Sequence, residues 1–115
     1  MMKSNVQTLP GGTVKYAVSD SAVRYTLRDN AFTETRNGNF QYERTLSKQV
    51  MDKKSPKLKI TISKDLSVFT MNTVTANGLK KIDLFKTNER QEAREFAEFI
   101  LKDFIENGVL VKVND

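Results

Sequence analysis

Four charged side chains flank the dipeptide Asn37-Gly38, and their types and spacing come closest to a catalytic arrangement: Glu34, Arg36, Glu43 and Arg44. If the segment folds into a hairpin, Glu34 and Glu43 can face one another, and paired carboxylates can perform general acid–base chemistry. Facing carboxylates repel each other unless bases intervene, and the two arginines are placed to do so. A cross-strand charge ladder therefore explains all four residues, and we assign no catalytic residue.

The chain of 115 residues contains no histidine, cysteine or tryptophan, which removes most of the chemistry open to a small protein. It lacks a side chain that ordinarily titrates near neutral pH, a thiolate nucleophile and the nitrogen and sulfur ligands of zinc. Asp52 and Asp65 do not have the spacing of a calcium loop. Pro10-Gly11-Gly12 precedes a predicted strand, whereas a phosphate-binding loop follows one. We expect no metal and no cofactor, and we favour a binding or accessory role over an enzyme.

A basic sheet surface is the second candidate site. Outward-facing bases are expected on the hairpin and the strands that follow it, and an outward tyrosine among them could stack on a nucleobase. The residues of this candidate surface are Arg36, Tyr42, Arg44, Lys57, Lys59 and Lys80. Such a surface would contact phosphates with little reading of base sequence. Because the chain has no recognition helix, zinc finger or RNP-type motif, we favour the alternative of a solvated basic face.

Charge is distributed unevenly along the chain, whose net charge is +5. Residues 1–88 hold fifteen basic and seven acidic side chains, whereas residues 89–106 hold six acidic and three basic ones. A basic body that carries an acidic helix could attract a charged partner. The partner classes left open are a protein, a small molecule and a second copy of the chain. Nucleic acid is less favoured, and no membrane partner is expected.

Turn signals and alternation divide the first half of the chain into short elements. Residues 1–12 indicate a loose lead-in, and Thr13–Ser19 alternates like a half-buried strand. Residues 20–28 suit either a strand or a short helix, and the polar pair before them, with Asp20 as a plausible N-cap, favours the helix. Asn37-Gly38 predicts a type I′ hairpin between two strands. Residues 47–56 are polar and include a proline, which is typical of a surface loop.

Three further segments continue this pattern as an antiparallel meander. Leu58–Ser63 alternates, with its leucine and isoleucines expected to face inward. Leu66–Thr75 changes its apolar parity between Val68 and Phe69, which indicates either a β-bulge or a strand buried on both faces. Asn77-Gly78 predicts a tight turn, after which Leu79–Lys86 returns as another strand.

The segment Asn88–Asn107 is the clearest element in the chain. Asn88 can cap its first turn, and the pair Asn107-Gly108 supplies a left-handed C-cap. Apolar residues recur at spacings of three and four, and we interpret its phenylalanines as core rather than as a ligand-binding cluster. Val109–Val113 follows as an edge strand. The expected fold class is thus α+β: one domain with a curved, mainly antiparallel sheet, covered on one face by a long C-terminal helix.

Several motifs resemble a family of short, uncharacterised bacterial proteins that is catalogued under amino-acid metabolism. The resemblance extends from Thr13 to the C-terminal helix, and its most specific parts are Leu27-Arg28-Asp29, Gly38-Asn39-Phe40-Gln41 and Asn77-Gly78-Leu79. It implies a TATA-box-binding-protein-like fold and a role linked to amino-acid metabolism, and it supplies no catalytic residues. No segment has the apolar run of a signal peptide or a membrane span, so we expect a cytoplasmic protein.

Overall fold

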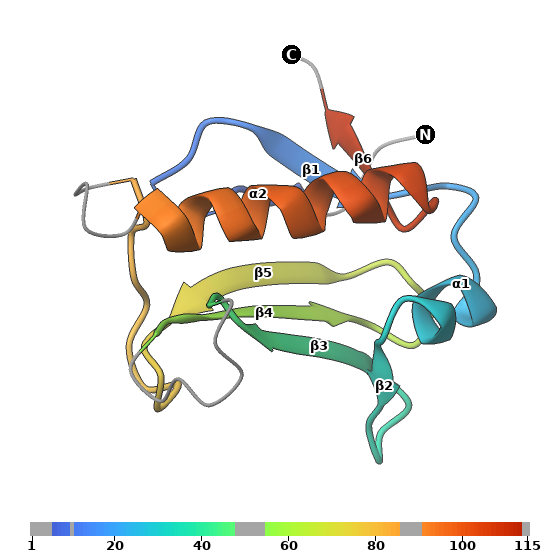
Figure 1. Ribbon diagram of the computed structural model, residues 1–115. Coiled ribbons are helices and arrows are strands. Elements are labelled where there is room, and N and C mark those ends of the chain that lie inside the picture. Colours follow the sequence, from blue (N-terminus) through green and yellow to red (C-terminus); the bar gives the residue numbers. More distant parts are fainter. Residues whose placement is uncertain (1–5, 10, 48–54, 86–90, 114–115) are drawn as a thin grey trace.

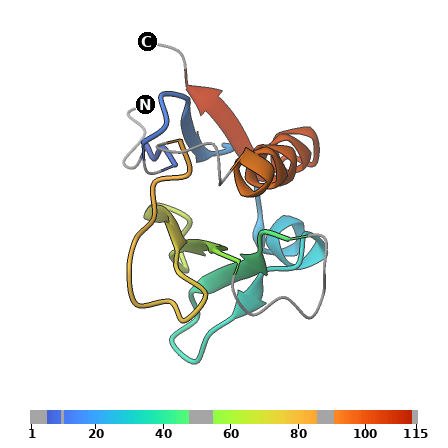
Figure 2. The same ribbon diagram turned by 60° about the vertical axis from the view of Figure 1, so that its left-hand side comes forward.

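Two antiparallel sheets and a long helix build the fold (Figures 1 and 2). The computed structural model describes residues 6–9, 11–47, 55–85 and 91–113. Its elements in chain order are β1 (Lys15–Val18), α1 (Arg24–Asp29), β2 (Thr33–Glu34), β3 (Phe40–Thr45), β4 (Lys57–Ile62), β5 (Phe69–Val74), α2 (Gln91–Glu106) and β6 (Leu110–Val113). The α+β class and the antiparallel meander are confirmed. The sheet is divided, because β1 pairs with β6 while β2, β3, β4 and β5 form the larger sheet in that order.

The core lies between the four-stranded sheet and the layer formed by α2 and the β1–β6 pair (Figures 1 and 2). Leu58, Ile60 and Ile62 on β4 are buried, as their alternation predicts. α2 contributes Ala97 and Leu101, which are fully buried. Alternate residues of each strand therefore face α2, and the opposite face of the larger sheet is polar.

The β2–β3 turn differs from the predicted type I′ turn. A type I′ turn requires a positive φ at both Asn37 and Gly38. Gly38 has a φ of 89°, but Asn37 does not have a positive φ, since Ala31 and Leu66 are the non-glycine residues with positive φ in the described part of the chain. The amide of Gly38 donates a hydrogen bond to the carbonyl of Thr35 at 2.9 Å, and the Thr35 amide donates to Asn39 at 2.7 Å. The connection is thus a three-residue loop with glycine at its left-handed position.

The parity change between Val68 and Phe69 has a simpler cause than a bulge or a doubly buried strand. The amide of Ser63 donates to the carbonyl of Val68 at 2.9 Å, so Val68 still belongs to the β4–β5 connection. Val68 is 48% exposed, and β5 begins at the fully buried Phe69. The predicted strand Leu79–Lys86 is reduced to a bridge between Lys81 and Val74 within its described residues.

Both helices end close to their predicted limits. α1 begins after Val23, whose amide donates to the Thr26 hydroxyl at 3.2 Å, so Asp20 is not its N-cap. Asn88, the predicted cap of α2, lies outside the described residues. At the C-terminus the amides of Gly108 and Val109 donate to carbonyls of the last turn at 3.3 and 2.8 Å, and Gly108 has a φ of 81°. This Schellman arrangement confirms the predicted glycine cap.

The described part of the predicted lead-in packs onto β1. Gln7 and Tyr16 exchange two backbone hydrogen bonds of 2.9 and 2.8 Å, and Leu9 is buried. These residues are therefore held against the core and are not loose, because an apolar side chain and a backbone pair anchor them. Most of the predicted loop 47–56 lies outside the described residues.

Candidate functional site

The predicted basic surface is not assembled as one face of the sheet. Tyr42 is buried at 7% exposure and lies on the face of β3 that packs against α2, which rules out the expected outward stacking position. Arg44, two residues further along β3, is exposed on the same side. Its guanidinium carbon lies 5.2 Å from the ring centre of Phe96 on α2.

Lys57 and Lys59 lie on the opposite face of the sheet, where both pair with one carboxylate. Their ammonium groups are 3.3 and 3.8 Å from the carboxylate oxygens of Glu43 on β3. Arg36 and Lys80 belong to two different turns, between β2 and β3 and after β5. The six predicted residues thus occupy separate places, because alternation sends neighbours on one strand to opposite faces.

The predicted pair of facing carboxylates is also absent. Glu34 lies opposite Phe40, and Glu43 lies opposite Lys59. Glu34 accepts hydrogen bonds from Arg28 at 2.8 Å and from Arg24 at 3.1 Å. These bonds lower the pKa of the Glu34 carboxyl, and the bond from Arg28 has the larger effect. Glu34 therefore holds α1 against β2, a structural role that involves neither Arg36 nor Arg44.

A groove along one flank of α2 is the strongest candidate site in the described part of the chain. It has a volume of about 600 Å³ and lies between α2, β3 and the residues that end α1. Figures 1 and 2 show α1 below the C-terminal half of α2, and residues 29–31 at the end of α1 line the groove. Its size and its largely apolar lining are typical of small-molecule sites.

Three aromatic rings that pack against one another support this groove. Tyr42 and Phe104 meet edge to face with ring centres 5.0 Å apart and an interplanar angle of 82°. Phe32 lies 5.5 Å from each of them. Tyr42 and Phe104 line the groove and belong at the same time to the core, so the floor is rigid and formed before any ligand arrives.

Charged side chains of both signs line the groove around these rings, and the described residues form no ion pair between them. Arg44 and four carboxylates, two of which are Glu95 and Asp103, line the groove. Among the described residues no carboxylate oxygen comes within 4 Å of the Arg44 guanidinium. Burial raises the pKa of the Tyr42 hydroxyl, a hydrogen bond with Arg44 opposes the rise, and the charge of Asp103 adds to it. Tyr42 is therefore neutral at physiological pH and lies within electrostatic reach of both charges.

A contact between the C-terminal ends of the two helices forms part of the groove wall. The side-chain amide of Asn107 donates to that of Asn30 at 2.9 Å, across 77 positions of sequence. Ala31 follows with a φ of 72°, which alanine adopts rarely. A strained residue beside a cavity is a common mark of a functional site.

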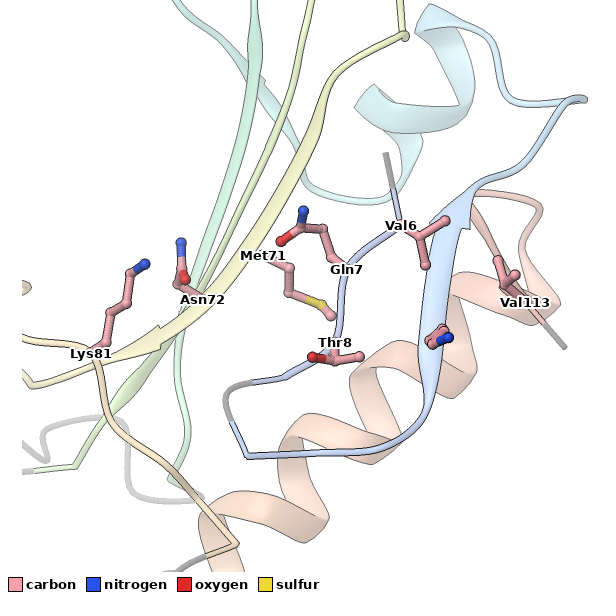
Figure 3. A pocket seen from close by; sticks show the side chains of 8 residues that line it. Val6, Gln7, Thr8, Met71, Asn72, Lys81 and Val113 are labelled. Atoms are coloured by element: carbon pink, nitrogen blue, oxygen red, sulfur yellow. The ribbon is translucent and has the colours of Figure 1, made fainter. Parts of the chain in front are cut away.

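A second cavity of about 550 Å³ lies between the edge of β5 and residues 6–8, and we call it the cleft (Figure 3). Lys15 and Lys81 line it, together with the side chains of Gln7, Thr8 and Asn72. No acidic side chain is among the described residues that form its wall. The cleft is more open to solvent than the groove, and most of the described residues that line it have polar or charged side chains.

Sequence reasoning missed the groove, although one signal was present. It took the phenylalanines of α2 as core, which holds for Phe104, but Phe99 is 64% exposed at the groove mouth. Phe99 lies outside the apolar stripe and follows Glu95 and Glu98 on a helix face that is otherwise acidic. A lone aromatic residue on an acidic face would have pointed to this flank.

Two kinds of site find no support in the described residues. None of their acidic side chains gather in a group of three or more that could hold a metal ion. Neither described helix combines the length and apolar character that a passage through a bilayer requires.

Comparison with known proteins places the chain among relatives. A family model, DUF1831, described as "Putative amino acid metabolism", matches residues 1–111. The crystal structure of a DUF1831 family protein from Lactobacillus plantarum superposes with a TM-score of 0.85 at 37% identity, and the match covers 94% of this chain and 95% of that one. No curated protein matches the chain. The chain belongs to the DUF1831 family.

Proposed function

We propose that this protein is a binding protein of amino-acid metabolism that holds a small molecule in the groove between α1, β3 and α2. The observation that carries the proposal is the pairing of an apolar, preformed floor with separated charges of both signs. Such a site can bury a ligand and also fix its orientation. The cysteine-free composition fits a reducing cytoplasm as the setting of this role.

The family description supports the metabolic setting, and the site supports binding rather than catalysis. The groove has no histidine or cysteine, and its charged groups are not joined in a nucleophile–base pair. Binding of nucleic acid receives no comparable support, because Tyr42 faces the core and Glu43 forms ion pairs with Lys57 and Lys59 and so offsets part of their charge.

A titration followed by two-dimensional ¹H–¹⁵N NMR tests this proposal. The full chain is titrated with single amino acids, with the corresponding amines and with the corresponding carboxylic acids, each to millimolar concentration. We expect at least one compound to shift the amide signals of α2 residues around Phe96 and Phe99 together with those of Tyr42. If no compound shifts these signals, or if the shifts occur only around the cleft, the proposal is wrong.

A further inference from the structure

We propose that the ligand of the groove is a free α-amino acid with an apolar side chain, bound as a zwitterion. Its carboxylate binds Arg44, its ammonium group binds Asp103, and its side chain lies against Phe99. This inference rests on the proposed function and adds the chemical class of the ligand.

Arg44 is the cation that fits a carboxylate. It is the one basic side chain among the described residues that line the groove, and no carboxylate of the described chain neutralises it. Its guanidinium lies against the Phe96 ring, which holds the fork of donors in place and shields it from water on one side. The neutral Tyr42 hydroxyl beside it can donate a second hydrogen bond to the same carboxylate.

Asp103 is the anion best placed for the ammonium group. It is half-buried, and its charge is close enough to Tyr42 to affect the pKa of that hydroxyl. Its carboxylate has no ion-pair partner among the described residues. Phe96, which contacts Arg44, lies seven residues before Asp103 on α2. Seven residues span about 10 Å along the helix axis. That span accommodates the ammonium and carboxylate groups of one α-amino acid together with a salt bridge to each of them.

Phe99 indicates the apolar part of the ligand. It lies between Phe96 and Asp103 on the same flank of α2 and is 64% exposed, next to the buried Ile100. A bound apolar side chain would cover the Phe99 ring and remove it from water. A simple amine cannot form the charge-assisted hydrogen bonds with Arg44, and a simple carboxylic acid cannot form those with Asp103. Both are therefore expected to bind less tightly than the zwitterion.

Three ligands of one shape test the inference: phenylalanine, phenethylamine, which lacks the carboxylate, and 3-phenylpropionate, which lacks the ammonium group. Affinities are measured with the full chain by isothermal titration calorimetry. We expect phenylalanine to bind at least about tenfold more tightly than either analogue, because each lacks one charge-assisted hydrogen bond.

Two variants assign each charge to its partner. Arg44→Gln should weaken phenylalanine and 3-phenylpropionate by about tenfold and leave phenethylamine unchanged, and Asp103→Asn should show the converse pattern. Arg36→Gln, in the exposed β2–β3 turn, is the matched control and should change none of the three. A variant that is merely less stable would weaken all ligands alike, so the pattern is informative even if stability falls.

The outcomes separate the two proposals. Equal binding of phenylalanine and phenethylamine, with no effect of Arg44→Gln, would overturn the zwitterion while leaving the groove as the binding site. The same holds for equal binding of phenylalanine and 3-phenylpropionate with no effect of Asp103→Asn. No binding of any amino acid, amine or acid at the groove would overturn both proposals.

Discussion

The groove and the cleft have similar volumes but opposite character. The groove is lined by four carboxylates and one arginine over buried aromatic rings, whereas the cleft is lined by two lysines and several neutral polar side chains. The groove lies on the core, since Tyr42, Ile100 and Phe104 belong to both. The cleft lies between the edge of β5 and residues 6–8, and Met71 is the one buried core residue among the described residues that line it. A preformed binding site can therefore be expected on the groove side, where the residues of the floor cannot move without disturbing the core.

The largest expected effect comes from the groove floor. Phe104→Ala should lower the free energy of unfolding by about 3–5 kcal/mol, because it leaves a cavity beneath Tyr42 and Phe32. The matched change in the cleft, Asn72→Ala, should cost less than about 1 kcal/mol. Urea unfolding followed by circular dichroism measures both. Equal losses would show that the cleft is as much a part of the core as the groove.

A smaller effect, on ligand affinity, distinguishes the exposed apolar residues at the openings of the groove and the cleft. Phe99 and Val6 are exposed apolar side chains at the groove and at the cleft, with exposed fractions of 64% and 38%. Both alanine variants should change unfolding free energy by less than about 0.5 kcal/mol. Phe99→Ala should nevertheless weaken phenylalanine binding by about 1–2 kcal/mol, the burial of one apolar side chain, while Val6→Ala should not. Equal affinities of the two variants would remove Phe99 from the site.

The difference between the two regions also explains what sequence alone could predict. Alternation along β4 and the apolar spacing of α2 reflect burial, so the packed side of both elements was identified correctly. The glycine cap of α2 depends on its own neighbours, and it too was predicted. Such features follow from residues within a few positions of one another.

The groove depends on contacts between distant residues, and no local pattern encodes them. Arg44 reaches Phe96 across 52 positions, and Asn30 meets Asn107 across 77. The distribution of the six predicted surface residues over separate places has the same cause. Whether Tyr42 points outward depends on the register of β3 with β4 and on where α2 packs, neither of which is visible in a single strand.

The pH dependence of stability should involve the groove through Tyr42. Burial raises the pKa of its hydroxyl above 10.0, so its contribution to stability is fully present below pH 10 and is lost as pH rises through the folded pKa. Tyr42→Phe should lower the free energy of unfolding by about 1 kcal/mol at pH 8, because it removes the hydrogen bond between the Tyr42 hydroxyl and Arg44. The difference from the native chain should shrink as pH rises above 10 and through the raised pKa of Tyr42. Tyr16 has a raised pKa as well, but it is present in both proteins and cancels. A difference that stays constant across this range contradicts the prediction.

The smallest expected effect lies at the strained rim of the groove. Ala31 has a φ of 72°, and no described residue that lines the cleft has a positive φ. The left-handed conformation costs alanine about 1–2 kcal/mol, and glycine avoids that cost while losing about 0.5–1 kcal/mol to its unfolded-state entropy. Ala31→Gly should therefore raise the free energy of unfolding by about 0.5 kcal/mol.

Gly38→Ala is the opposite change at a comparable angle, with a φ of 89° and an added Cβ that would lie 3.0 Å from the Lys64 side chain. It should lower the free energy of unfolding by about 1 kcal/mol or more. Both values come from urea unfolding at pH 7, with phenylalanine affinity measured in parallel. If Ala31→Gly stabilises the fold and weakens binding, the strain holds the rim of the groove in its binding geometry. If it destabilises the fold, contacts of the alanine methyl group outweigh the strain, and the groove and the cleft do not differ in this respect.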